Sequence, residues 1–221
     1  MRIDIHQPEI FSTIFESVTG SQLYHPVKGI TTDSRNVVEG DLYIALKGER
    51  VDGHTFLDHV SDAGASAALV SCKDENLEFQ QVKVNDPLME IGNLANAWRR
   101  QFDVPVIGIT GSNGKTSTKE LLVHILSGSY NVHATEGNFN TSVGLPLTLF
   151  QLNDSRTISI LEMGANQAGD IEYLCSIAQP THGLITNIAP AHLSRFRTID
   201  VITETKGALF NSLKDGIAFV N

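Results

Sequence analysis

Short apolar runs alternate with amphipathic stretches along the second half of this chain. Five runs of aliphatic and β-branched residues indicate buried strands, at 104–110, 132–135, 157–161, 183–188 and 217–220. Apolar residues at helical spacing between them predict helices at 119–126, 146–150, 170–178 and 199–213. Strands and helices in turn are typical of βαβ units with a mostly parallel sheet. We therefore predict an α/β domain at 104–221.

The first 84 residues have an α/β pattern of their own. Helical spacing predicts a helix at 7–19 that stops at Gly20, and short strands are expected near 30, at 42–46 and at 67–70. We predict a small domain at 1–84. An amphipathic stretch that begins with Asp86-Pro87, an N-cap and a first-turn proline, predicts a linker helix at 85–103.

The most specific pattern lies where the run at 104–110 ends. A glycine turn follows, and Lys115-Thr116 opens a helix. In this arrangement, backbone N–H groups and the lysine bind a polyphosphate, while the threonine hydroxyl can reach Mg²⁺. Ile109 stands where the standard G-x-x-x-x-G-K-[ST] motif needs glycine, so this is a short form. An ordinary glycine turn is the alternative. The predicted phosphate-binding residues are Gly111, Ser112, Asn113, Gly114, Lys115, Thr116 and Ser117.

Ligands of open α/β sheets collect at the carboxyl ends of the strands, which meet at one edge. Glu162 ends the strand at 157–161, so its carboxylate is a predicted Mg²⁺ ligand beside the glycine loop. His192 follows the strand at 183–188 and is either a second metal ligand or an ordinary surface residue. Nothing in the pattern alone separates Lys206 from a surface lysine.

Two polar loops carry further candidates. Asn138 and Asn140 lie in a glycine-flanked loop, where asparagines either bind a ligand or stabilise turns. Ser34 and Arg35 follow a strand of the first domain, and Arg35 could bind a phosphate or sugar. A local turn with a surface arginine is equally compatible with that segment.

Composition limits the partners of this chain. The formal net charge of −9 argues against a broad nucleic-acid-binding surface, so any polyanion must bind at a local site. Cys72 and Cys175 lie far apart and lack metal-binding spacing, as expected for reduced thiols. The sequence contains no pattern of a signal peptide or membrane span, and we expect a cytoplasmic protein.

Together, these motifs resemble the Mur ligases of peptidoglycan synthesis. The short phosphate loop, unusual for a general P-loop, is the form that this family uses. In the second domain, the resemblance rests on Thr110–Ser117, Glu136–Asn140, Gly144–Thr148, Leu161–Asn166 and Asn187–His192. In the first, Thr32–Arg35, Gly40–Gly48 and Asp52–Phe56 resemble the family's UDP-binding domain.

The resemblance implies roles for individual residues. Lys115 and Thr116 would hold ATP and Mg²⁺, and Glu162 would be a metal ligand. His192 would help to bind a second Mg²⁺, and Lys206 would be carbamylated and serve the same site. Lys115, His192 and Lys206 would thus be the catalytic residues. Contacts with the UDP-sugar substrate are expected from Ser34, Arg35, Asn138 and Asn140.

Within the family, the motifs are most similar to the ligase that adds D-alanyl-D-alanine (D-Ala-D-Ala) to UDP-N-acetylmuramoyl-tripeptide (UDP-MurNAc-tripeptide). This similarity implies ATP-dependent amide formation through an acyl phosphate, in a monomer. Mur ligases have three domains, so we expect this chain to be a fragment that lacks the C-terminal one and the remainder of the central one. The alternatives are a Mur ligase that adds the third amino acid, a folylpolyglutamate synthetase and a non-catalytic nucleotide-binding module.

Overall fold

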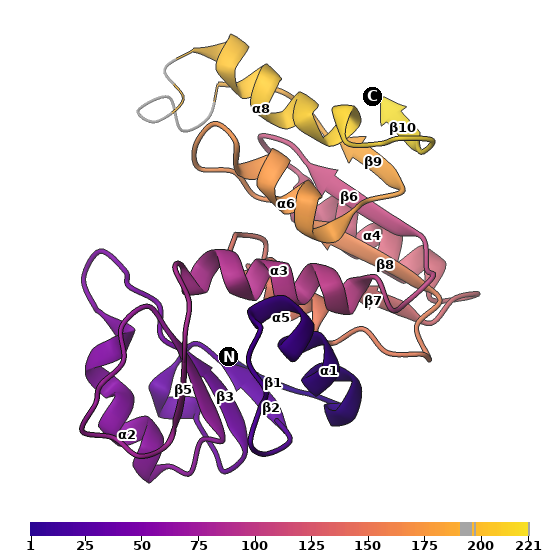
Figure 1. Ribbon diagram of the computed structural model, residues 1–221. Coiled ribbons are helices and arrows are strands. Elements are labelled where there is room, and N and C mark those ends of the chain that lie inside the picture. The colour runs from indigo at the N-terminus through magenta and orange to yellow at the C-terminus, as the bar shows by residue number, and fades with distance from the viewer. Residues whose placement is uncertain (191–195, 197, 221) are drawn as a thin grey trace. The chain divides into compact units, whose positions relative to one another are not determined.

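The computed structural model describes residues 1–190, 196 and 198–220, and the chain divides into two compact units, Met1–Trp98 and Arg99–Asn221 (Figure 1). Each unit contains its own five-stranded sheet with helices, which confirms the predicted α/β class. The stretch predicted as a linker helix forms α3 (Pro87–Arg99), and all of it except Arg99 falls within the first unit.

The sheet of the first unit has the strand order β1-β2-β3-β4-β5. β1 pairs antiparallel with β2, and the other pairings are parallel. The edge strands β1 and β5 were not predicted, because their residues are mostly polar or charged and show no apolar run. The strands are β1 (Arg2–Asp4), β2 (Gly29–Thr31), β3 (Asp41–Ile44), β4 (Ala67–Val70) and β5 (Gln80–Lys83). The helices are α1 (Pro8–Thr19), α2 (Leu57–Asp62) and α3, with 3-10 turns η1 (Ser34–Asn36) and η2 (Gly53–Phe56).

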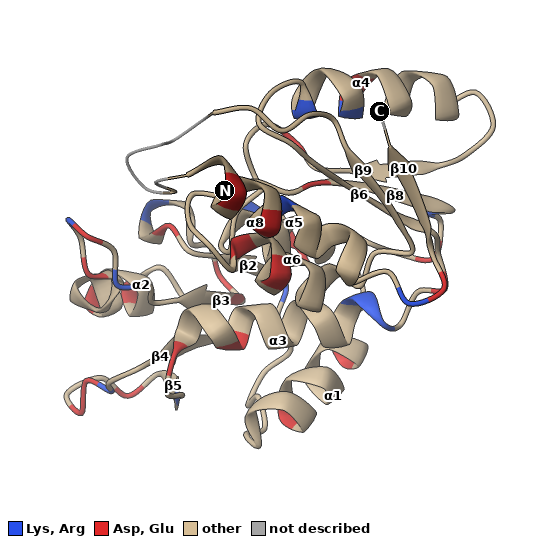
Figure 2. Cartoon of the chain, turned by 90° about the horizontal axis from the view of Figure 1, so that it is seen from above, with Lys and Arg blue, Asp and Glu red and all other residues tan. Residues whose placement is uncertain are grey.

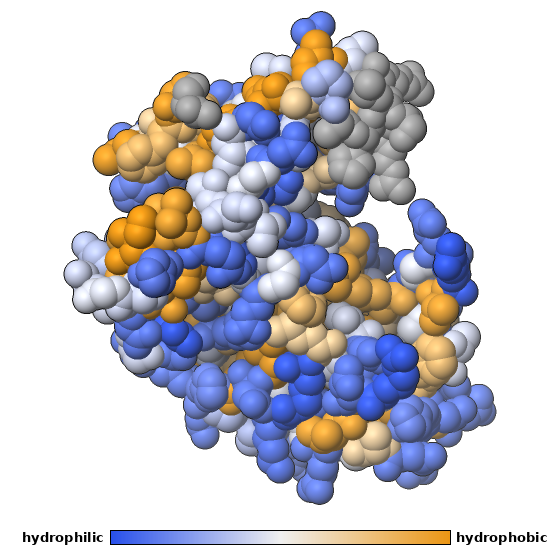
Figure 3. All heavy atoms as spheres, turned by 180° about the vertical axis from the view of Figure 1, so that it is seen from behind, coloured by the Kyte–Doolittle hydropathy of each residue, from blue (hydrophilic) through white to orange (hydrophobic). Residues whose placement is uncertain are grey.

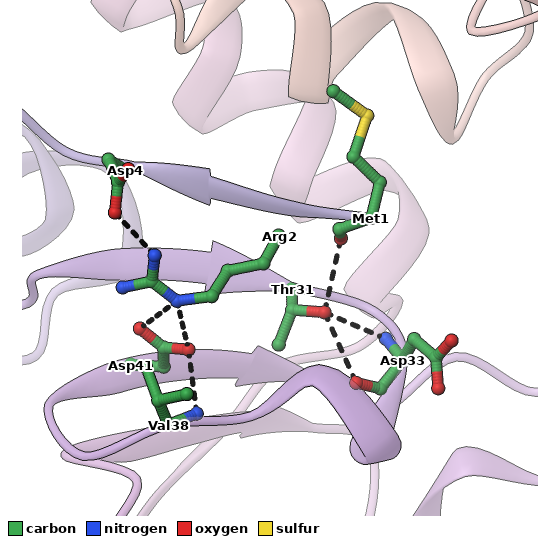
Figure 4. Close-up of polar contacts among 7 residues, drawn as sticks. All are labelled: Met1, Arg2, Asp4, Thr31, Asp33, Val38 and Asp41. Carbon is green, nitrogen blue, oxygen red and sulfur yellow. Dashed lines mark hydrogen bonds and ion pairs between the residues drawn. The ribbon is translucent and has the colours of Figure 1, made fainter.

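A buried ion pair holds the edge strand β1 in this sheet (Figure 4). The Asp41 carboxylate is fully buried and accepts hydrogen bonds from Arg2 Nε, at 3.0 and 2.7 Å, and from the Val38 N–H at 3.0 Å. Gly29 leaves room for the pair, since a Cβ there would lie 2.5 Å from Arg2 Nη2. A buried carboxylate without its cation is strongly unfavourable, so this pairing favours one register of β1.

The sheet of the second unit has the order β10-β9-β6-β8-β7, and all its pairings are parallel. The chain runs from β6 outward to β7, and after β8 it moves to β9 on the other side of β6. This reversal makes a topological switch point at the carboxyl end of β6, where open α/β sheets bind ligands. The strands are β6 (Val106–Thr110), β7 (Val132–Ala134), β8 (Ile158–Glu162), β9 (His182–Ile185) and β10 (Ile217–Val220).

Helices cover both faces of this second sheet. One face is covered by α4, and the other by α6 and α8 (Figures 1 and 2). All five predicted strands and the helices between them are present, although several boundaries shift by one to four residues. The helices are α4 (Lys115–Leu126), α5 (Gly144–Leu149), α6 (Asp170–Ala178) and α8 (Ile199–Asn211).

The surface is a mosaic of hydrophilic and hydrophobic residues on the face that Figure 3 shows. Within residues 1–190 and 198–220, no helix has both the length and the apolar character needed to cross a bilayer. Cys72 is exposed, Cys175 is buried, and both are free thiols.

We predict that Arg2→Met destabilises the first unit by on the order of 3 kcal/mol, because Asp41 would stay buried without its cation. Urea unfolding followed by Trp98 fluorescence would measure the effect, since Trp98 is the chain's one tryptophan. Its ring packs against Phe11 of the same unit, with 6.3 Å between the ring centroids. The matched control is Arg50→Met at an exposed arginine, for which we expect a change below about 0.5 kcal/mol. Equal unfolding midpoints for the two variants would contradict the prediction.

Candidate functional site

The glycine loop joins the central strand β6 to α4. Gly114 adopts a left-handed conformation (φ 79°) at the N-cap of α4, and no side chain caps this helix. The first N–H groups of a helix have no partner within the helix and attract anions. Lys115 Nζ folds back to donate to the Gly111 carbonyl at 2.8 Å. Lys115 and Lys119 lie at the start of α4, the end of that helix that is blue in Figure 2. This arrangement is suited to binding a polyphosphate.

A segment that follows β9 lies against the same loop. Gly111 is needed there, because a Cβ at this position would lie 1.9 Å from Thr186 Oγ1. Ser112, a predicted phosphate contact, instead forms hydrogen bonds with this segment. Its Oγ donates to the Ala189 carbonyl at 2.8 Å, and its N–H donates to the Asn187 carbonyl at 3.0 Å. Thus the first half of the loop faces protein.

The Glu162 carboxylate lies beside the loop and is only 2% exposed. One oxygen accepts from the Thr116 hydroxyl at 2.8 Å, and the other from the Asn140 amide at 2.7 Å. The Glu162 N–H donates to Thr135 Oγ1 at 3.0 Å. The structure therefore brings together three of the predicted site residues, on α4, the loop after β7 and the end of β8.

These oxygen atoms fit Mg²⁺. A carboxylate and a hydroxyl are the hard ligands that Mg²⁺ takes, together with phosphate oxygens and water. No cluster of three or more His, Cys, Asp or Glu side chains occurs in the part of the chain that the structure describes. An ion bound by Thr116 and Glu162 would thus need further ligands from the nucleotide or solvent. His192, the other predicted metal ligand, lies outside the described residues.

Lys119 supports this site and was not predicted from the sequence. Lys119 is 2% exposed, donates to the Thr135 carbonyl at 2.6 Å and pairs with Glu120 at 2.7 Å. Because Thr135 in turn accepts the Glu162 N–H, Lys119 supports the segment that holds Glu162. The available signal was its position one turn after Lys115, on the same side of α4.

Lys206 is buried in α8 at 5% exposure, so the interpretation of this residue as a surface lysine is wrong. Burial, together with the positive charge of Lys115, lowers the pKa of the Lys206 amine to about 8. The charged amine still predominates at pH 7, but the neutral form is far more accessible than in an ordinary lysine. This electrostatic coupling links Lys206 to the glycine loop.

The other predicted contacts are placed differently. Asn138 is exposed in the loop after β7, and its carbonyl accepts the Asn140 N–H at 2.8 Å. Ser34 and Arg35 belong to the first unit. Ser34 is buried, whereas the Arg35 side chain is 85% exposed and makes two hydrogen bonds to Asp33, at 2.9 and 2.7 Å. The Arg35 guanidinium lowers the pKa of the Asp33 carboxyl to about 2.

Comparison with known proteins connects both units to one family. Residues 109–221 match the Mur ligase middle domain, and residues 26–102 match a domain described as "Mur ligase family, catalytic domain". The chain is 42% identical over 182 residues to the UDP-N-acetylmuramoyl-tripeptide–D-alanyl-D-alanine ligase of Synechocystis sp.. The matched stretch covers 81% of this chain and 40% of that relative.

Solved structures agree with this match. A crystal structure of MurF from Acinetobacter baumannii has a TM-score of 0.89 at 35% identity, over 94% of this chain and 47% of that one. MurF ligase from Thermotoga maritima in complex with ADP has a TM-score of 0.81 at 38% identity, over 86% of this chain and 44% of that one. This chain spans about half the length of the relatives it matches. It belongs to the Mur ligase family and is homologous to MurF.

Proposed function

We propose that this chain is the substrate- and ATP-binding part of a ligase that adds D-Ala-D-Ala to UDP-MurNAc-tripeptide. The observation that carries this proposal is the hydroxyl of Thr116, in the glycine loop, at 2.8 Å from the buried carboxylate of Glu162. The names of the relatives support the choice of substrates. Residues 1–84 would bind the UDP-substrate, and residues 104–221 would bind ATP in a cytoplasmic, monomeric enzyme.

The proposed reaction forms an amide in two steps. A carboxylate oxygen of the tripeptide attacks the γ-phosphorus of ATP, and the bond to the leaving ADP oxygen breaks. The dipeptide amine, having lost a proton, then attacks the carbonyl carbon of the acyl phosphate, and inorganic phosphate leaves. Negative charge on the transferred group is the main electrostatic problem in such reactions. The Lys115 ammonium and the N–H groups at the start of α4, which no side chain caps, are the groups that would stabilise it.

Thr116 and Glu162 would hold one Mg²⁺, and His192 and Lys206 would serve a second. Mg²⁺ supplies neutralising charge to the phosphate oxygens when it is bound. Asn140 donates its amide N–H to Glu162, which fixes the orientation of that carboxylate and leaves the Asn140 Oδ1 for the UDP-sugar. Asn138, Ser34 and Arg35 would supply the other contacts, with Arg35 exchanging Asp33 for a substrate phosphate.

Carbamylation of Lys206 is consistent with its surroundings. A lysine reacts with CO₂ only as the neutral amine, and the pKa of about 8 makes this form accessible. The carbamate would also replace a positive charge near Lys115 with a negative one. The unfavourable interaction between two cations would then become a favourable ion pair.

The ligase assignment predicts that phosphate release from ATP requires both UDP-MurNAc-tripeptide and D-Ala-D-Ala. A chain extended to the length of the relatives should show this dependence in a phosphate-release assay, whereas the 221-residue chain should bind ATP without completing ligation. Phosphate release that does not depend on either substrate would instead favour a nucleotide-binding module of another kind.

In the extended chain, Lys115→Ala should abolish ligation while the fold survives, because the partly exposed ammonium contributes charge rather than packing. The expected loss is at least 10³-fold in kcat, on the order of effects seen for groups that stabilise transferred charge. Circular dichroism would establish folding. The control is Lys73→Ala at an exposed lysine of the first unit. Normal turnover by the Lys115 variant would refute the mechanism.

The lowered pKa of Lys206 predicts how carbamylation of this lysine depends on pH. The amine is neutral above its pKa, so the carbamate should develop as pH rises through about 8, whereas ordinary lysines require a pH near 10.5. Carbon-13 NMR of the protein with carbon-13-labelled bicarbonate would detect the signal of the carbamate carbon. Lys206→Arg should remove it, and Lys214→Arg, at an exposed lysine, should not. A carbamate signal that persists in the Lys206 variant would contradict the assignment.

A further inference from the structure

The segment Thr186–Ala189, which we call the bracing segment, is joined to the glycine loop by a dense set of hydrogen bonds. It directly follows β9, the neighbour of β6 in the sheet. Ser112 Oγ and the backbone of Ala189 form a reciprocal pair, at 2.8 and 3.0 Å, and the Ser112 N–H donates to the Asn187 carbonyl at 3.0 Å. These contacts hold residue 112 from two sides.

Asn187 adds a contact through its side chain. Its Oδ1 accepts the N–H of Asn113 at 2.9 Å, and the Thr186 hydroxyl donates to the Asn113 carbonyl at 2.6 Å. Both polar backbone groups of Asn113 are thus bound to the bracing segment. Since Gly111 has no Cβ to block Thr186, the two segments can approach this closely.

These bonds divide the amides of the loop into two groups. The N–H groups of Ser112 and Asn113 point to Asn187, and so they are used within the protein. The N–H groups at the start of α4, which begins at Lys115, have no side-chain cap. Only this second group is open to an anion.

Resting on the proposed function, we propose that Asn187 is a positioning residue for the polyphosphate of the nucleotide. By holding Asn113, its side chain fixes the first half of the loop, so that the N–H groups of the second half converge on the phosphates. A mobile first half would have to become ordered when the anion binds, and this ordering costs affinity. Asn187 itself does not contact the phosphates.

The test measures binding of ATP and of inorganic tripolyphosphate to the 221-residue chain by calorimetry. Asn187→Ala should weaken both ligands by the same factor, about five- to ten-fold, because one hydrogen bond that orders the loop is lost. Amide exchange at Asn113 in the free protein should become faster. Asn187→Asp keeps an acceptor oxygen and should restore slow exchange, while its negative charge weakens tripolyphosphate binding in a salt-dependent way.

Asn153→Ala is the matched control. Asn153 Oδ1 accepts the Ser155 N–H at 3.1 Å in the turn before β8, at the amino end of that strand, whereas the glycine loop lies at the carboxyl end of the parallel neighbour β6. A bond from a backbone N–H to an asparagine side chain is thus removed away from the loop. This variant should bind both ligands like the unsubstituted chain, and thermal unfolding would verify that all variants fold.

Unchanged or tighter binding by Asn187→Ala, with normal binding by the unsubstituted chain, would overturn this inference alone. Tighter binding would mean that Asn187 competes with the phosphates for the Asn113 N–H. Absence of binding by the unsubstituted chain would overturn the proposed function, and the role of Asn187 with it.

Discussion

A carboxylate that is almost completely buried, that of Glu162, is the constraint on which the second unit depends. Removal of a charged group from water is costly unless hydrogen bonds replace its hydration. Here Thr116 and Asn140 each occupy one oxygen of the carboxylate, and Thr135 accepts the N–H of the same residue. Since these partners come from α4 and the loop after β7, one charge determines how these segments meet at the end of β8.

The parallel sheet makes this arrangement possible. With β6 at its centre, the ends of β8 and β9 lie on either side of the glycine loop. Glu162 then approaches the loop from one side, and the segment Thr186–Ala189 from the other. The first half of the loop is held by protein groups, and the start of α4 stays open to an anion. The same edge therefore combines rigidity with a free set of donors, which is the requirement for stabilising transferred phosphate charge.

Much of the fold followed from local patterns. The five strands of the second unit lie in apolar runs of the sequence, and the glycine loop between β6 and α4 has a characteristic composition. β1 and β5 were not predicted because their residues are mostly polar or charged and show no apolar run. Lys119 was missed, and the local pattern did not distinguish Lys206 from a surface lysine, because a lysine is normally exposed. Both side chains are buried only through tertiary packing, which for Lys119 includes a hydrogen bond to the Thr135 carbonyl.

The sequence by itself determined the order of strands and helices, the position of the glycine loop and the identity of the acid at the end of β8, since each depends on residues adjacent in the chain. The pattern also predicted that this acid lies beside the glycine loop, but only the tertiary structure decided which hydrogen bonds build the site. Asn187 lies 74 residues from Asn113, and Asn140 lies 22 from Glu162, so their hydrogen bonds have no local signal. The lowered pKa of Lys206 likewise arises from burial and from Lys115 on another helix. Such effects act through space, and they exist only after the sheet has assembled.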